Sequence, residues 1–266
     1  MCLLFVAVDA HPAHALVLAG NRDEAHARPT EPLGWWADAP DVAAGRDLDA
    51  GGTWLGATRR DAAGGCRWAT VTNVRDPGDI HADRRSRGTL VADFLRGREA
   101  PGEYAERVQA ERGLYNGFNL LVGRGAEVHY ASSRREHAER LTPGIYGLSN
   151  DALDTPWPKL THGRDAFADA LATPRLDPAS LLPFLRNETV APDGELPDTG
   201  VGLDLERVLS PLFIRGERYG TRATTALVLD RDGGGRLAEQ TWGAGGTRGP
   251  LVQIDLATPA PDQAGP

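Results

Sequence analysis

The stretch MCLLFVAVDAHPAHALVLAGNRDE, residues 1–24, decides how the chain begins to fold. Its first apolar run, Cys2–Val8, is continuous and rich in branched side chains, a pattern typical of a strand covered on both faces. Asp, Pro and His interrupt the run, and a second apolar run, Ala15–Gly20, follows. Two short apolar runs around a turn predict a β-hairpin.

The hairpin has a register that can be predicted from the position of its turn. With the turn near His11 or Pro12, antiparallel pairing places Cys2 opposite Gly20, Asn21 or Arg22. This register brings the polar cluster NRDE, residues 21–24, beside the Cys2 thiol. We expect this cluster just after the buried strand.

The rest of the chain predicts strands and helices in separate groups. Apolar runs predict strands at Gly52–Thr58, Trp68–Asn73, Phe118–Gly123, Val128–Ser132, Thr221–Asp230 and Leu237–Trp242. Helical patterns occupy Ser86–Arg96, with Ser86 as the expected cap, Gly102–Arg112, Lys159–Leu171 and Pro178–Arg186. This grouping favours an α+β layered fold. We expect a single domain over residues 1–255 and a disordered tail over 256–266.

Composition excludes several classes of protein. The 266 residues carry a formal net charge of -8, whereas a nucleic-acid surface needs a basic footprint. No apolar run approaches the length of a membrane span, and the N-terminal run lacks the basic start of a signal peptide. The two cysteines do not suggest a disulfide framework or a metal cluster. We therefore expect a cytoplasmic protein without stable membrane insertion.

Cys2 has two interpretations. As a strand residue it is a small apolar side chain. If Met1 is removed, the α-amine of Cys2 becomes a base attached to a nucleophile, as in N-terminal-nucleophile enzymes. A nearby Arg22 would favour the thiolate, and Asp23 could hold the ammonium group.

Other polar side chains occur at predicted strand ends or turns, where asparagine amides can stabilise an oxyanion and arginine can bind a carboxylate or phosphate. They are Asn73, Asn116, Asn119, Asn150, Arg222 and Thr225. RRSRG, residues 84–88, is a basic cluster that could meet an anion, although a solvated face is its ordinary role. His11, His14 and His26 could ligate haem or zinc but are more typical of solvated turns.

Five segments in order resemble the NRDE (transport and Golgi organization protein 2-like) family. They are the Met-Cys start, NRDE, GGTWLG (residues 51–56), YNGFNL with YGLSN (residues 115–120 and 146–150), and YGTR (residues 219–222). The resemblance runs from Met1 to about Trp242. It implies the four-layer αββα sandwich of N-terminal nucleophile hydrolases.

The resemblance also implies a site. Its catalytic residues would be Cys2, Arg22, Asp23, Asn119 or Asn150 (both are candidates for the oxyanion hole), and Arg222. From their places in the sequence we add as candidate ligand-binding residues Asn21, Glu24, Trp54, Asn73, Asn116 and Thr225, although packing is the more ordinary role for Trp54. The related hydrolases usually carry Arg-Asn-x-Asp, whereas this chain reads Asn21-Arg22-Asp23. No metal and no required cofactor is implied.

Two functions follow from the resemblance. The first is binding of haem or of an acyl-lipid or acyl-CoA-like ligand around Cys2, in haem trafficking or lipid homeostasis. The alternative is an N-terminal cysteine amidohydrolase or acyltransferase that cleaves a linear amide or thioester through an acyl-Cys2 intermediate. The expected partner is a small molecule and not a nucleic acid, and a homodimer is compatible with the sequence.

Overall fold

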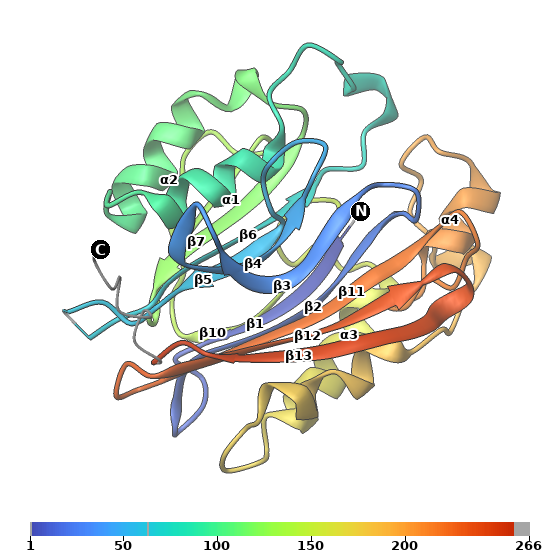
Figure 1. Cartoon of the computed structure of the whole chain (residues 1–266). Coiled ribbons are helices and arrows are strands. Elements are labelled where there is room, and N and C mark those ends of the chain that lie inside the picture. Colours follow the sequence, from blue (N-terminus) through green and yellow to red (C-terminus); the bar gives the residue numbers. More distant parts are fainter. Residues whose placement is uncertain (1, 63, 258–266) are drawn as a thin grey trace.

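A computed structural model describes residues 2–62 and 64–257, and these form two antiparallel β-sheets. The first sheet has six strands in the order β10-β1-β2-β11-β12-β13 (Figure 1). Its strands are β1 (Cys2–Val8), β2 (His14–Ala25), β10 (Gly144–Leu148), β11 (Tyr219–Asp230), β12 (Gly235–Gly243) and β13 (Thr247–Asp255). The β1–β2 hairpin therefore lies inside the sheet, where both of its strands are paired on both edges.

The second sheet has seven strands in the order β3-β4-β5-β6-β7-β8-β9. They are β3 (Thr30–Trp36), β4 (Ala39–Asp47), β5 (Leu55–Thr58), β6 (Arg67–Asn73), β7 (Phe118–Arg124), β8 (Glu127–Ser132) and β9 (Glu139–Arg140). Sequence neighbours pair throughout, so this sheet is a simple meander.

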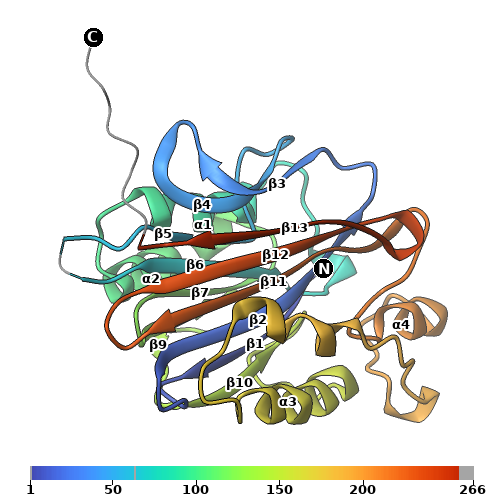
Figure 2. The same ribbon diagram turned by 60° about the horizontal axis from the view of Figure 1, so that its bottom comes forward.

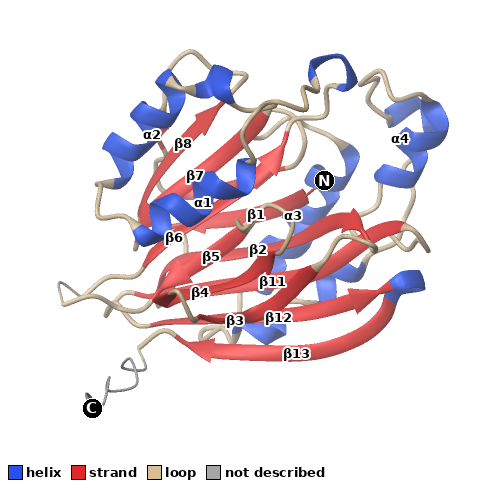
Figure 3. Ribbon diagram, turned by 45° about the horizontal axis from the view of Figure 1, so that its top comes forward, coloured by secondary structure: helices blue, strands red, loops and turns tan. Residues whose placement is uncertain are grey.

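Helices cover the outer face of each sheet (Figures 2 and 3). The α-helices are α1 (Arg87–Arg96), α2 (Pro101–Ala110), α3 (Pro158–Ala170) and α4 (Leu203–Leu209). Helices α1 and α2 pack on the seven-stranded sheet through a core that includes Phe94 and Phe118. Helix α3 packs on the six-stranded sheet through Phe5 and Phe167, whose rings stack at 5.8 Å. The predicted four-layer αββα sandwich is confirmed.

The alternation of side chains along β1 explains the layering. Leu3, Phe5 and Ala7 enter the core beneath α3, whereas Leu4 and Val6 enter the core between the sheets. Because both faces are covered, all seven residues of the strand are buried. The continuous apolar run at the start of the sequence therefore corresponds to a strand with a hydrophobic core on each of its two faces.

The predicted hairpin register is confirmed, since Cys2 pairs with Arg22. The predicted strands are all present, although β5 starts at Leu55 and not at Gly52. The placement of NRDE after the strand is wrong. Residues 21–24 lie within β2, because β11 pairs with that strand as far as Ala25.

Two helical expectations need correction. Ser86 precedes α1, but its side chain makes no capping hydrogen bond; its carbonyl instead accepts the Thr89 hydroxyl at 2.7 Å. The expected helix at Pro178–Arg186 is two short 3₁₀ helices, because Pro183 has no N–H for a continuous α-helix.

The predicted disordered tail begins too early at residue 256. Leu256 is fully buried, and residues 258–266 lie outside the described residues.

Candidate functional site

A cleft of about 740 Å³ opens where the two sheets meet the segment before α1. Strands β1, β2, β11 and β12 supply one wall, with Cys2 and Arg22 among its residues. The opposite wall includes Trp54, Asn73 and the segment around Arg87. The cleft thus collects residues from the beginning, middle and end of the chain.

Cys2 and Arg22 open into this cleft from neighbouring strands. Only 7% of Cys2 is exposed, and burial raises the pKa of its thiol, an effect that the Arg22 charge partly opposes. The thiol is therefore largely protonated at neutral pH unless a ligand or a base changes its surroundings.

Asp23 is the next side chain along β2 and is also buried. One of its carboxylate oxygens accepts the Thr221 hydroxyl at 2.7 Å, and its backbone carbonyl accepts the Tyr219 hydroxyl at 3.2 Å. Burial raises the pKa of Asp23, and the charge of Lys159 in α3 opposes the shift. Lys159 is itself buried, which lowers its pKa to about 8.

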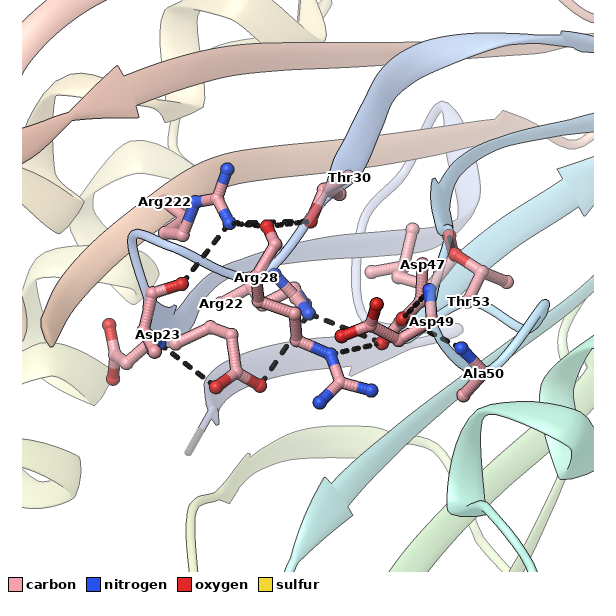
Figure 4. A network of polar contacts seen from close by, with 12 residues as sticks. Arg22, Asp23, Arg28, Thr30, Asp47, Asp49, Ala50, Thr53 and Arg222 are labelled. Carbon is pink, nitrogen blue, oxygen red and sulfur yellow. Dashed lines mark hydrogen bonds and ion pairs between the residues drawn. The ribbon is translucent and has the colours of Figure 1, made fainter.

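Ion pairs and carbonyl contacts connect the strands around Arg22 (Figure 4). The Arg22 guanidinium lies 3.6 Å from Glu24 and 3.7 Å from Asp47. Arg28 binds Asp47 much more closely, at 2.6 Å. The Asp47 carboxylate is thus held mainly by Arg28, and Arg22 keeps only the two longer contacts.

Arg222 holds the turn between β2 and β3 (Figure 4). Its Nη1 donates to the carbonyls of Ala25 and Arg28 and to the Thr30 hydroxyl. Arg222 also lines the cleft. In this structure the hydrogen bonds of Arg222 fix the loop that carries Arg28.

Eight of the predicted site residues line the cleft: Cys2, Arg22, Asp23, Glu24, Trp54, Asn73, Asn116 and Arg222. Asn73 ends β6, and its backbone carbonyl accepts the Asn150 amide at 3.0 Å. Among the described residues, no hydrogen-bond partner is present for the Asn73 side-chain amide, which is therefore available to a ligand. Asn116 instead exchanges two hydrogen bonds with the backbone of His81.

The other four predicted residues do not line the cleft. Asn21 donates to the carbonyls of Leu185 and Leu212 at 2.9 and 2.8 Å. It also accepts the Thr224 hydroxyl. These partners lie on the helix-covered side of the sheet, because Asn21 alternates with Arg22 along β2. Asn21 therefore ties this sheet to the segment that covers it.

Asn119, Asn150 and Thr225 also have internal partners. Asn119 donates to the Asp151 carbonyl and accepts the Tyr130 and Ser132 hydroxyls. Thr225 donates to Glu239 at 3.1 Å. Asn73 therefore lines the cleft, whereas Asn119 and Asn150 do not, and Asn150 donates to the Asn73 backbone carbonyl.

The predicted histidines do not gather around Cys2. His11 and His14 are buried and stack at 4.5 Å, and His14 binds Asp230 at 2.6 Å. They occupy the turn end of the hairpin, at the opposite end of the strands from Cys2. His26 contacts the Gly216 carbonyl at 3.1 Å.

Comparisons with known proteins identify the family. The family model described as "Transport and Golgi organisation 2" matches residues 1–244. The chain belongs to the Transport and Golgi organisation 2 family.

Curated members of this family match most of the chain. The Bos taurus homolog of transport and Golgi organization protein 2 is 35% identical over 258 residues, covering 88% of this chain and 90% of that protein. The Homo sapiens homolog is 36% identical over 255 residues, with the same coverage. The Drosophila melanogaster protein is 29% identical over 267 residues, covering 91% and 92%.

Among solved structures, an Anbu (Gly-1) mutant from Hyphomicrobium sp. strain MC1 aligns with a TM-score of 0.41 and 10% identity. The alignment covers 96% of this chain and 87% of that one. The four-layer arrangement follows from the two sheets of this chain and the helices that cover them, independently of this alignment.

Two cleft residues of this family member were not expected from the sequence. Glu239 of β12 is buried, and its carboxylate accepts the Leu33 N–H at 2.8 Å; burial raises its pKa. Arg87 also lines the cleft; RRSRG was interpreted as a cluster that could meet an anion, with a solvated face as its ordinary role, and Arg87 was not among the predicted site residues. Because Arg236, Gln240 and Thr241 of the same strand are also polar, no sequence signal singles out Glu239.

Neither a metal centre nor a membrane-spanning helix occurs in the described part of the chain. Its residues contain no group of three or more His, Cys, Asp and Glu side chains that could hold a metal ion. Within residues 2–62 and 64–257, no helix is long and apolar enough to cross a membrane.

Proposed function

We propose that this member of the Transport and Golgi organisation 2 family binds an acyl-lipid or acyl-CoA-like ligand in the cleft, with the acyl carbonyl beside Cys2. The observation that carries the proposal is that Cys2 and its partner Arg22 open together into one cleft. A thiol and a guanidinium on adjacent strands provide a reactive and a cationic group within one binding site.

The lining of the cleft matches an amphipathic ligand. Apolar surface comes from Trp54, Val71, Ile80, Trp242 and Pro250. The lining also contains seven arginines and five carboxylates of the described residues, so arginines outnumber carboxylates. Such a lining offers burial to a hydrocarbon chain and ion pairing to acidic groups.

Titration calorimetry of the full chain with decanoyl-CoA tests this binding. We expect saturable 1:1 binding that persists in Cys2→Ala, because a carrier needs the cleft and not the thiol. Arg98→Gln, a substitution at an exposed residue outside the cleft lining, is the charge-matched control. Absence of binding by the wild-type chain would contradict the proposal.

Haem is a second ligand that the cleft could hold. Of the residues that line it, Cys2 and His81 carry a thiol and an imidazole, the side chains able to ligate iron. His81 is exposed and contacts Asp79 at 3.1 Å. A haemin titration should give a Soret shift that Cys2→Ala or His81→Ala removes; an unchanged spectrum in the wild-type chain would count against haem.

Acyl transfer is the second candidate function, and the position of Cys2 favours it. In this reaction the Cys2 sulfur attacks the carbonyl carbon of a thioester, and the bond to the departing sulfur breaks. The departing thiolate takes the proton released by Cys2, which leaves an acyl-Cys2 thioester and a free thiol. The Asn73 amide would donate to the oxyanion, and the α-amine of Cys2 would carry the proton if Met1 is removed.

Intact mass spectrometry separates the two functions. Acyl transfer requires a chain that starts at Cys2 and gains the mass of one acyl group on incubation with decanoyl-CoA. A chain that retains Met1 and gains no mass, yet binds decanoyl-CoA, is a carrier. The cytoplasmic location and the homodimer stay predictions, which cell fractionation and sedimentation velocity test.

A further inference from the structure

Two glycine-containing segments that are distant in sequence, GGTWLG and RRSRG, are in direct contact. The N–H of Thr53 donates to the Gly88 carbonyl at 3.2 Å. A Cβ atom on Gly52 would lie 2.4 Å from the Gly88 carbonyl carbon. The segments thus meet backbone to backbone, and this contact fixes the segment that carries Arg87 on the cleft wall.

Arg87 is half-buried in this wall and has few partners. Its Nη1 donates to the Gly117 carbonyl at 3.2 Å. Among the residues that the structure describes, no carboxylate forms an ion pair with its guanidinium. Burial lowers the pKa of Arg87, and the neighbouring Cys2 and Glu24 act in the opposite direction, which places all three groups in one electrostatic environment.

Arg22 lines the cleft from β2 of the six-stranded sheet, and most of its N–H donors have no protein acceptor among the described residues. Its contacts with Glu24 and Asp47, at 3.6 and 3.7 Å, are longer than hydrogen bonds. Each guanidinium has five N–H donors, and leaving such donors unsatisfied in a partly buried site costs free energy. Arg84 differs from both, because Asp79 and the Tyr115 carbonyl already engage it.

We propose that Arg87 and Arg22 together bind the carboxylate or phosphate group of the ligand in the cleft beside Cys2. Both side chains line the cleft, Arg22 from β2 and Arg87 from the start of α1, and a carboxylate or a phosphate would accept hydrogen bonds from both. This inference rests on the proposed function and adds to it the chemical class of the ligand and the residues that select it.

Three probes with the same hydrocarbon chain test the anion site: decanoate, decyl phosphate and decanol. By calorimetry on the full wild-type chain, we expect at least one of the two anions to bind about 10-fold or more tightly than decanol. Which of them binds tells whether the site takes a carboxylate, a phosphate or both.

Arg87→Gln should reduce the preference for anions to within about 3-fold while leaving decanol binding unchanged. Arg87→Lys, which keeps the charge but loses the paired donors, should retain part of the preference and serves if the glutamine variant fails to fold. Arg98→Gln removes the same charge outside the cleft lining and should bind as wild type does.

The outcomes distinguish the two proposals. If wild type binds decanol as tightly as the anions, or if Arg87→Gln and Arg87→Lys keep the full preference, the anion site is wrong even when decanoyl-CoA binds. If neither the decyl probes nor decanoyl-CoA binds to wild type, the proposed function fails as well.

Discussion

Cys2 and Arg22 are paired directly across the β1–β2 hairpin, and both side chains open into the same cleft. Burial raises the pKa of the Cys2 thiol and the Arg22 charge lowers it, so Arg22→Gln should raise the pKa of this thiol further. The pH dependence of iodoacetamide alkylation, followed on the Cys2 peptide by mass spectrometry, measures this. An unchanged profile in Arg22→Gln would show that the pair is not electrostatically coupled.

Asn21 should matter for stability more than for binding. Asn21→Ala leaves the buried carbonyls of Leu185 and Leu212 without a donor, which should cost about 3 kcal/mol in the free energy of unfolding. Asn73→Ala is the matched comparison and should weaken ligand binding with little change in stability. Urea unfolding and calorimetry measure the two effects, and the reverse pattern would place Asn21 in the site.

Gly52 should tolerate no side chain. Gly52→Ala forces its Cβ against the Gly88 backbone and should cost roughly 1–3 kcal/mol, together with part of the ligand affinity. Gly113→Ala is the control, because a Cβ there has nothing within 4 Å. Thermal unfolding of both variants checks the difference; equal melting temperatures would mean that the two segments can separate without loss.

The contribution of Lys159 to stability should increase in alkaline solution. Its pKa is about 8 in the folded chain, whereas an unperturbed lysine has a pKa of 10.5. Between these pH values the unfolded state binds the extra proton, so this contribution to the free energy of unfolding rises with pH, by about 3 kcal/mol in total. Below pH 8 both states are protonated, and above 10.5 neither is.

Lys159→Met removes this dependence. Urea unfolding at pH 8 and pH 10 should give a change in the free energy of unfolding that is more favourable for wild type than for Lys159→Met, because the raised pKa of Cys66 acts in both proteins. Lys159 is the only lysine of the chain, so the contribution can be assigned to one side chain. The same gain in both proteins would contradict the lowered pKa.

The hairpin and its register were predictable because they depend on neighbouring residues. Two apolar runs and one turn place Cys2 opposite Gly20, Asn21 or Arg22 with no information from elsewhere in the chain, and the structure has Arg22 there. The strands at Trp68–Asn73 and Val128–Ser132 were predictable for the same reason. By contrast, β3 contains Pro32 and Gly34, which weaken the sequence signal for a strand.

The roles of individual polar residues were less predictable, because their partners are distant in sequence. Asn21 binds carbonyls 164 and 191 positions away, and an asparagine in a strand gives no indication of this. For RRSRG the sequence left a solvated face and an anion contact both open, whereas in the structure Gly88 contacts Gly52 and Arg87 lines the cleft. Only the folded chain shows this contact.

The most direct test of the ligand site is protection of Cys2 from alkylation by decanoyl-CoA. Cys66 is the internal control, since burial raises the pKa of its thiol to about 11 and it does not line the cleft. We predict that saturating decanoyl-CoA slows iodoacetamide labelling of the Cys2 peptide several-fold and leaves that of the Cys66 peptide unchanged. Equal labelling of Cys2 with and without decanoyl-CoA would contradict an acyl ligand seated beside this thiol.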